Sequence, residues 1–321
     1  MDLNSSLEGI LKKSKKAILI GIGGGGDVVG TIPTAGLLRM FDIEYILGGL
    51  PWERFVYDPV PGPRSFDEIK DARPLNDTVW FANKDTVTTT GVRFAESEMA
   101  EIYGNEVLLF DITRGVAGVI DGLLKAMKGL GADLVIGIDV GGDCIAFGHE
   151  EGLASPLADA IMTAALREIQ IQKEFNAILG VFGYGSDGEL TPQELEKSLS
   201  VISGEGGFLG AWGITPSILR ELERVTSKVH TEASRIPVEC AKGARGEGAI
   251  RGETRKVYLS TASTLTFYLS PQVVYEKVSK PARLVSTSKS IEEANEALHS
   301  IGLFTELDLE RERQKRTLER S

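Results

Sequence analysis

The chain has 321 residues, of which 42% are hydrophobic and 25% are charged, and its formal net charge is −11 at pH 7. The acidic balance opposes nucleic-acid binding, and no window approaches the roughly 18 apolar residues of a membrane span. Its two cysteines, Cys144 and Cys240, imply no disulfide framework and fit a reducing compartment. We therefore expect a cytoplasmic protein with neither a nucleic-acid nor a membrane partner.

Short apolar runs rich in β-branched residues recur through the first two-thirds of the chain, as is typical of strands buried on both faces of a parallel sheet. They are Ala17–Ile22, Ile43–Leu47, Thr78–Ala82, Val107–Phe110, Leu134–Ile138 and Ala177–Phe182. Segments with helical spacing separate them at Phe94–Tyr103, Gly115–Leu130 and Pro156–Ile169. This alternation predicts an α/β fold, a doubly wound, mostly parallel Rossmann-like sheet.

The last third of the chain is less regular. Thr191-Pro192 and Thr215-Pro216 predict two helix starts. After them the sequence predicts a loop over 235–253, strands at Val257–Leu259, Leu265–Leu269 and Pro281–Val285, a helix at Ile291–Ile301 and a charged tail from Leu307. We expect residues 1–234 to form the Rossmann-like core, and residues 235–321 to form a C-terminal α+β extension packed on the same domain.

A glycine-rich or polar loop follows each predicted strand. These loops are Gly23–Asp27, Gly48–Arg54, Asn83–Gly91, Asp111–Gly115, Asp139–Asp143 and Gly183–Glu189. In an open parallel sheet the carboxyl ends of the strands share one edge, and ligands bind there. The sequence therefore predicts a ligand site at this edge.

Glycines cluster in three of these loops. Without a Cβ, the backbone N–H groups can converge on an anion, and the following helix adds the positive end of its dipole. The predicted phosphate-binding glycines are Gly23, Gly24, Gly25, Gly26, Gly141, Gly142, Gly183 and Gly185. Tight turns between strand and helix would use the same glycines, so this alternative stays open.

The spacing of Gly21, Gly23 and Gly26 also fits the dinucleotide-binding fingerprint. That fold places an acid at the end of its second strand to bind the ribose. Here the second strand ends in Gly48-Gly49, and the nearest acid after it is Glu53. An NAD(P)-dependent oxidoreductase is therefore the second hypothesis rather than the first.

Four aspartates lie beside the loop glycines: Asp27, Asp139, Asp143 and Asp187. Converging carboxylates bind Mg²⁺ through hard oxygen ligands and hold it against phosphate. We predict Asp139, Asp143 and Asp187 as metal ligands, Asp143 and Asp187 also as catalytic groups, and Asp27 as part of the ligand-binding loop. Helix capping or turn formation would account for any one of them alone.

Arginines interrupt the acidic composition between residues 235 and 256. Arg245 and Arg251 could lie on a flap that meets a phosphate or carboxylate, or on a solvated loop. Cys144 has apolar neighbours on its C-terminal side, so we expect it to be buried as a small hydrophobic residue.

The motifs GIGGGGDVVG, ILGGLPWER, DPVPGPR, DVGGD and GYGSDGE occur in this order. With them the chain resembles an uncharacterised prokaryotic, mostly archaeal, family, domain-of-unknown-function family 1152, over about Ala17 to Val285. The resemblance implies an α/β protein of prokaryotic, mostly archaeal, type and supplies no activity or catalytic residue.

The residues themselves favour a Mg²⁺-dependent enzyme that binds a nucleotide or another phosphorylated small molecule and catalyses phosphoryl transfer or hydrolysis. A non-catalytic sensor of a nucleotide or metabolite is the alternative from a different class. A homo-oligomer is compatible with either hypothesis.

Overall fold

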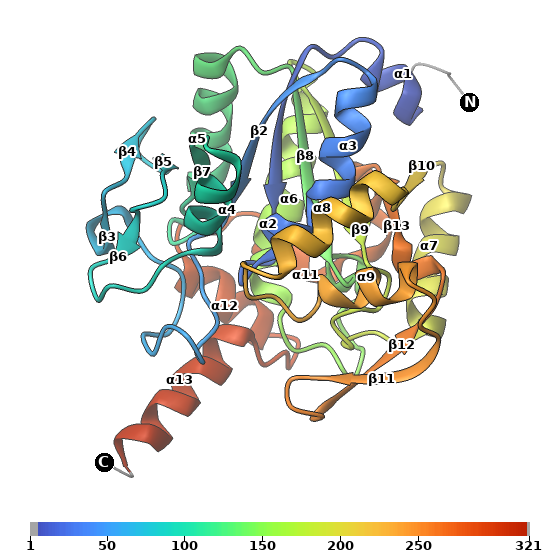
Figure 1. Cartoon of the computed structure of the whole chain (residues 1–321). Coiled ribbons are helices and arrows are strands. Elements are labelled where there is room, and N and C mark those ends of the chain that lie inside the picture. The colour runs from blue at the N-terminus through green and yellow to red at the C-terminus, as the bar shows by residue number, and fades with distance from the viewer. Residues whose placement is uncertain (1–5, 320–321) are drawn as a thin grey trace.

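A nine-stranded sheet runs through the middle of the molecule, and the computed structural model describes residues 6–319 (Figure 1). Its five central strands are parallel and stand in the order β9-β8-β1-β2-β7. They are β1 (Lys16–Gly21), β2 (Glu44–Gly49), β7 (Val107–Phe110), β8 (Leu134–Val140) and β9 (Asn176–Phe182). This order confirms the predicted Rossmann-like sheet. The order of the strands along the chain reverses between β1 and β8, as it does at the switch point of such sheets.

The two edges of the sheet are antiparallel to the centre where they join it. At one edge β5 (Val79–Ala82) pairs antiparallel with β7 and is followed by β4 (Arg73–Pro74). At the other, β13 (Leu265–Leu269) pairs antiparallel with β9 and is followed by β10 (Phe208–Gly213). Because β5 runs against its neighbour, the loop Asn83–Gly91 leaves the opposite edge of the sheet. Its predicted place among the carboxyl-edge loops was wrong.

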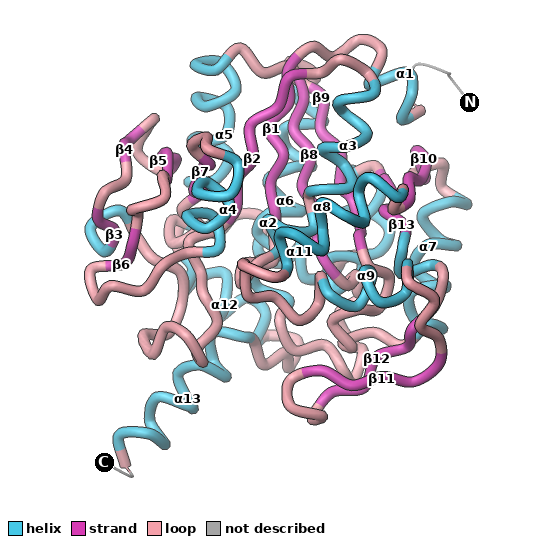
Figure 2. The backbone as a smooth tube through the Cα atoms, viewed as in Figure 1, coloured by secondary structure: helices cyan, strands magenta, loops and turns pink. Residues whose placement is uncertain are grey.

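Two small antiparallel sheets lie outside the large one. They pair β3 (Ile69–Lys70) with β6 (Val87–Thr88), and β11 (Gly246–Ile250) with β12 (Arg255–Leu259). Figure 2 shows the β11–β12 hairpin beyond the carboxyl edge of the parallel strands. The hairpin therefore lies on the side where the predicted ligand loops emerge.

Helices cover both faces of the sheet. They are α1 (Leu7–Leu11), α2 (Asp27–Gly30), α3 (Ile32–Met40), α4 (Ala95–Tyr103), α5 (Gly115–Leu130), α6 (Pro156–Gln172), α7 (Pro192–Gly204), α8 (Pro216–Thr226), α9 (Arg235–Ala241), α10 (Pro271–Val273), α11 (Lys280–Val285), α12 (Ile291–His299) and α13 (Glu306–Leu318). Single helical turns occur at Phe66–Glu68, Asp143–Ile145 and Ala262–Thr264, and a π-helical turn at Val274–Val278. Within residues 6–319, no helix has the length and apolar character needed to cross a membrane.

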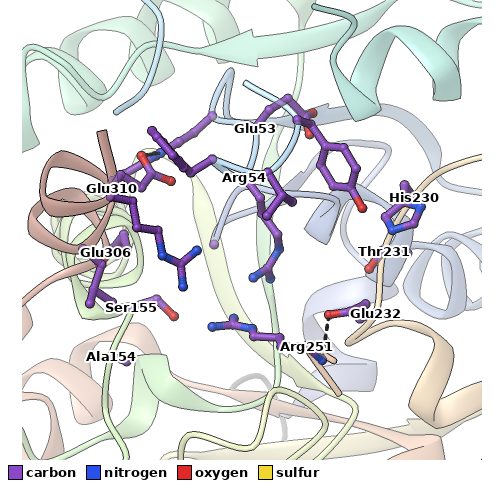
Figure 3. Close-up of a pocket in the computed structure, with 18 of the residues that line it drawn as sticks. Glu53, Arg54, Ala154, Ser155, His230, Thr231, Glu232, Arg251, Glu306 and Glu310 are labelled. Atoms are coloured by element: carbon purple, nitrogen blue, oxygen red, sulfur yellow. Dashed lines mark hydrogen bonds between the residues drawn. The ribbon is translucent and has the colours of Figure 1, made fainter. Parts of the chain in front are cut away.

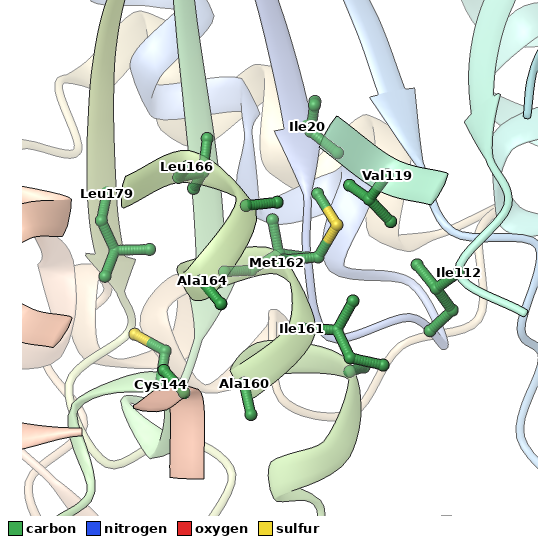
Figure 4. Close-up of a cluster of buried hydrophobic side chains, with 14 of the residues drawn as sticks. Ile20, Ile112, Val119, Cys144, Ala160, Ile161, Met162, Ala164, Leu166 and Leu179 are labelled. Atoms are coloured by element: carbon green, nitrogen blue, oxygen red, sulfur yellow. The ribbon is translucent and has the colours of Figure 1, made fainter. Parts of the chain in front are cut away.

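Alternate residues of β1 enter two different hydrophobic cores. Ile18 and Ile20 pack with α5 and α6 on one face, and Ala17 and Leu19 pack with α3, α4 and α8 on the other. Figure 4 shows the first core around Met162 of α6, with Cys144 at its margin. These four side chains are fully buried, which explains the unbroken apolar run of this strand. The burial of Cys144 confirms its predicted role in packing.

The predicted helix starts at Thr191 and Thr215 are confirmed, since both side chains accept a bond from a first-turn N–H group. Two predictions in the last third were wrong. The loop over 235–253 contains α9 and β11, and Pro281–Val285 is helical because Ser279 caps α11 and Pro281 lies in its first turn. Strand β13 joins the main sheet and α11 packs against α6, so this region shares the core of the preceding one.

Candidate functional site

The candidate site lies at the carboxyl ends of β1 and β8, two adjacent strands from which the chain leaves in opposite directions along the sheet. From β1 the chain passes to β2 on one side, and from β8 it passes to β9 on the other. In open α/β sheets this divergence leaves a crevice at the carboxyl ends of the two strands. The loops Gly23–Gly26 and Gly141-Gly142 follow these two strands, so the fold brings the predicted loops to one place.

Buried carboxylates converge at this point in two overlapping groups. Oxygen atoms of Asp139, Asp143 and Asp159 lie within 4.8 Å of one another, and so do those of Asp143, Asp187 and Glu189. All five side chains are buried. The structure thus places Asp143 in both groups, Asp139 in the first with Asp159 from the first turn of α6, and Asp187 in the second with Glu189.

Glu189 is the anchored member of the cluster. Its Oε2 accepts hydrogen bonds from Ala154 N (2.7 Å) and Ser155 N (2.9 Å), and its Oε1 accepts one from Arg255 (2.6 Å). Burial alone would raise the pKa of Glu189, but Arg255 and the bonds from Ser155 and Ala154 hold it below its ordinary value. Glu189 is therefore an ionised carboxylate whose oxygens are already occupied.

Asp159 and Asp187 differ from Glu189 because each retains an unbonded oxygen. Within residues 6–319, no hydrogen-bond partner reaches Oδ1 of Asp159 or Oδ2 of Asp187. Burial, followed by the neighbouring carboxylates, raises the pKa of Asp159 and Asp143 well above the ordinary value and that of Asp187 to about 8. A divalent cation would give these oxygens a partner and displace their protons.

Asp27 links the loops that follow β1 and β8. Its Oδ2 accepts hydrogen bonds from Gly23 N (3.0 Å) and Val140 N (3.3 Å). Asp139 is held in a similar way, since its Oδ2 accepts from Cys144 N at 3.1 Å. Asp27 therefore shapes the crevice and lies outside both carboxylate groups.

Most of the predicted glycine N–H groups are used inside the protein. The bonds run from Gly23 N to Asp27, Gly25 N to Trp52 O, Gly141 N to Phe182 O, Gly183 N to Leu265 O and Gly185 N to Gly141 O. Internal hydrogen bonds of these five N–H groups disfavour the prediction that they bind phosphate. The glycines instead permit close approach, because a Cβ on Gly23 would lie 2.6 Å from Asp27 Oδ2.

The other three glycines shape the loops in the same way. Gly24, Gly26 and Gly142 all have positive φ, of 71°, 108° and 126°. Gly26 precedes α2, and Gly142 precedes the helical turn that begins at Asp143. Left-handed backbone at these points favours glycine, so turn geometry explains them.

A cavity of about 560 Å³ opens beside the carboxylate cluster (Figure 3). Its wall is formed by Gly23, Gly25, Trp52, Glu53, Arg54, Phe55, Val56, Tyr57, Ala154, Ser155, His230, Thr231, Glu232, Arg251, Gly252, Thr254, Glu306, Leu309, Glu310 and Arg313. Ser155 connects the cavity to the cluster, since its hydroxyl donates to Glu189 and lies 3.3 Å from Asp143 Oδ2.

The cavity contains arginines from three separate segments. Arg251, on the hairpin turn, was predicted, whereas Arg54 and Arg313 were not assigned a role from the sequence. Figure 3 shows Arg54 and Arg251 projecting into the middle of the pocket. Arg245 lies elsewhere: its guanidinium donates to the carbonyls of Cys240 (2.9 Å) and Ala244 (2.5 Å), and it is not part of the cavity wall.

Several site residues escaped sequence reasoning although each carried a signal. Asp159 is an acid within an otherwise apolar helix face, and such an acid is seldom buried without a partner. Arg54 belongs to the quoted motif ILGGLPWER, and Arg255 to the basic stretch. The sequence does not indicate that α6, the loop Gly48–Arg54 and the β11–β12 hairpin lie next to one another.

Comparison with known proteins adds one match. The family model described as "Protein of unknown function (DUF1152)" matches residues 18–314, which extends the resemblance beyond Val285. Neither a curated protein nor a solved structure matches the chain.

Proposed function

The chain belongs to this DUF1152 family of proteins of unknown function, and from its own site we propose that it is a divalent-metal-dependent enzyme acting on a phosphorylated small molecule. The observation that carries the proposal is the pair of unbonded buried oxygens on Asp159 and Asp187, on either side of Asp143, next to an arginine-lined cavity. Phosphoryl transfer and phosphate hydrolysis are the reactions that use this combination.

The carboxylates fit Mg²⁺ by their chemistry. Asp143, Asp159 and Asp187 offer hard oxygen atoms, which Mg²⁺ prefers, and cysteine and histidine ligands are absent from both groups. Several buried carboxylates without counter-charge destabilise a fold. A bound cation would offset that cost, which supports Asp143, Asp159 and Asp187 as ligands and Asp139 as a neighbouring carboxylate.

The proposed reaction divides between the two halves of the site. Bound Mg²⁺ would neutralise charge on the phosphate oxygens. Arg251 and Arg54 would stabilise the remaining negative charge through N–H donors. A water or hydroxyl oxygen would form the new bond to phosphorus as the leaving group's P–O bond breaks, and Asp187 or Asp143 would accept the proton from the attacking oxygen.

Thermal unfolding with Mg²⁺ or Mn²⁺, alone and with ATP or ADP, tests this proposal. Ligand at a hundred times its dissociation constant stabilises a fold by about 2.7 kcal/mol. We expect metal to stabilise the wild type and the Asp121→Asn control, in which the changed residue is exposed on α5, but not Asp143→Asn. Equal metal responses of all three proteins would overturn the proposal.

Release of phosphate from the same nucleotides separates an enzyme from a sensor. Metal-dependent turnover that is lost in Asp187→Asn supports catalysis. Stabilisation by metal and nucleotide without any turnover would favour the sensor hypothesis instead.

A further inference from the structure

Two arginines in the cavity lie close together without a carboxylate between them. Arg251 is 3.9 Å from Glu189 Oε1, and burial, Arg54 and Arg255 lower its pKa to about 10. Within residues 6–319, the Arg54 guanidinium forms neither a hydrogen bond nor an ion pair, although its charge partly offsets the rise that burial causes in the pKa values of Asp27, Glu53 and Glu310. Since like charges repel at this range, the pair calls for an anion that both can bind.

The acids in the cavity wall are already hydrogen-bonded to donors other than these two guanidinium groups. Glu53 accepts from Ala95 N (2.7 Å), and Glu310 accepts from Trp52 Nε1 (3.0 Å) and Gly62 N (2.8 Å). Two further acids are also engaged: Glu306 accepts from Leu157 N and Ala158 N, and Glu232 accepts from Arg251 N. All four carboxylates thus accept from backbone or indole donors, whereas among residues 6–319 the Arg54 guanidinium has no hydrogen-bond partner and the Arg251 guanidinium has only the 3.9 Å ion pair with Glu189.

Arg251 begins the turn between β11 and β12. Its φ is +55°, and the adjacent Gly252 has a φ of +63°. Arginine rarely adopts this left-handed conformation, and glycine would fit with less strain. Tight hairpin turns require such positive φ values, and this turn directs the Arg251 side chain into the cavity (Figure 3).

The wall beyond Arg54 is suited to an uncharged organic group. Tyr57 N donates to Arg54 O (2.8 Å), so the two residues share one turn. The rings of Tyr57 and His230 meet edge to face at 4.7 Å, and Tyr57 is 42% exposed. Figure 3 shows Arg54 and Arg251 between His230 on one side of the pocket and Ser155 on the other, and Arg251 lies 3.9 Å from Glu189 Oε1.

We propose that the ligand of this cavity is an organic diphosphate or triphosphate of the nucleotide type. Its organic group would lie against Tyr57 and His230, its first phosphate at Arg54 and its next phosphate between Arg251 and the carboxylate cluster. The inference rests on the proposed function, because the outer phosphate is the one that reaches the metal. A monophosphate would contact Arg54 but not the metal.

Calorimetric titration with ADP and AMP, each at saturating Mg²⁺ and in EDTA, tests the inference. At saturating Mg²⁺ we expect the wild type to bind ADP about tenfold or more tightly than AMP, and in EDTA we expect this preference to be absent. Arg251→Gln should remove most of this preference. Arg54→Gln should weaken both ligands by about 10-fold, and the matched control Arg245→Gln should change neither.

Equal affinities for ADP and AMP in the wild type, or an unchanged preference in Arg251→Gln, would overturn the inference. Arg251→Lys keeps the charge without the forked donor geometry, so it should fall between wild type and Arg251→Gln, and melting curves establish that each variant is folded. Pyrophosphate bound as tightly as ADP would refute the role of Tyr57 and His230. Metal stabilisation without any ADP preference would refute this inference alone, whereas no metal response would refute the proposed function itself.

Discussion

Gly141 and Asp187 are so close that a Cβ on Gly141 would lie 2.2 Å from Asp187 Cγ. Gly141 also has a φ of +135°. Only glycine therefore allows the Asp187 carboxylate to lie against the β8 loop. This contact joins two of the loops that form the candidate metal site.

Gly141→Ala should destabilise the protein by about 3 kcal/mol and abolish metal-dependent stabilisation, because backbone strain and displacement of Asp187 combine. Gly131→Ala is the matched control, since Gly131 also has a positive φ (+68°) but no atom lies within 4 Å of its would-be Cβ. The control should lose only about 1 kcal/mol. Urea unfolding with and without Mg²⁺ measures both quantities, and equal losses would contradict the proposed contact.

Asp143→Asn should separate stability from metal binding. Asp143 is buried with four other acids whose charges raise its pKa after burial does. Removal of that charge should leave the metal-free protein as stable as the wild type, or more stable by about 1 kcal/mol. If the metal-free variant instead lost several kcal/mol, Asp143 would be a structural residue rather than a metal ligand.

Glu189 and Arg255 should be strongly coupled. Both are well buried, with side-chain exposures of 0% and 17%, and Arg255→Gln would leave the Glu189 charge without its main counter-charge. We expect a loss of about 3 kcal/mol and a coupling energy above about 1.5 kcal/mol in a double-mutant cycle with Glu189→Gln.

The exposed pair of Arg73 and Glu106 provides the comparison for that cycle. Its side chains are 58% and 41% exposed, and such pairs typically contribute below about 1 kcal/mol. Coupling energies of similar size in the two cycles would contradict the anchoring role of Glu189.

The stability of the metal-free protein should fall between about pH 4.5 and pH 7. Burial raises the pKa of Glu53 to about 7, so in this window the folded protein keeps a proton that the unfolded chain has released, and a rise in pH favours unfolding. One such proton contributes a slope of about 1.4 kcal/mol per pH unit.

Glu53→Gln should reduce the slope by about that amount. Unfolding at a series of pH values in EDTA measures it, and Glu296→Gln, at an exposed position on α12, controls for the loss of one carboxylate. An unchanged slope in Glu53→Gln would show that its proton is released before pH 5.

Periodicity and composition predicted the central sheet well, because a strand buried on both faces must be apolar throughout. The direction of a strand leaves no such mark. Val79–Ala82 looks like the parallel strands beside it, yet β5 is antiparallel to β7. Its direction depends on packing between segments far apart in the sequence, so the loop that follows it was assigned to the wrong edge.

The candidate site was predicted in part for a similar reason. Asp139 lies near the carboxyl end of β8, and Asp143 and Asp187 follow the parallel strands β8 and β9, so the strand order places them at one edge of the sheet. Asp159 reaches the cluster only because α6 begins beside it, and Arg54 reaches the cavity because its loop folds across Gly25. The internal acceptors of the glycine N–H groups, such as Trp52 O, lie in other loops, so the sequence could not indicate them.

Helix α13 has a consequence for the order of events during synthesis. Glu310 bonds to Trp52, 258 residues earlier in the chain, and Glu306 bonds to the start of α6. A ribosome-bound chain that has emerged as far as Glu189, in the loop after β9, already carries all five cluster carboxylates, but it lacks the arginine hairpin and one wall of the cavity. The nascent protein would thus be able to bind metal at the carboxylates before it could bind a ligand in the cavity. Ligand binding would then mark the completion of folding.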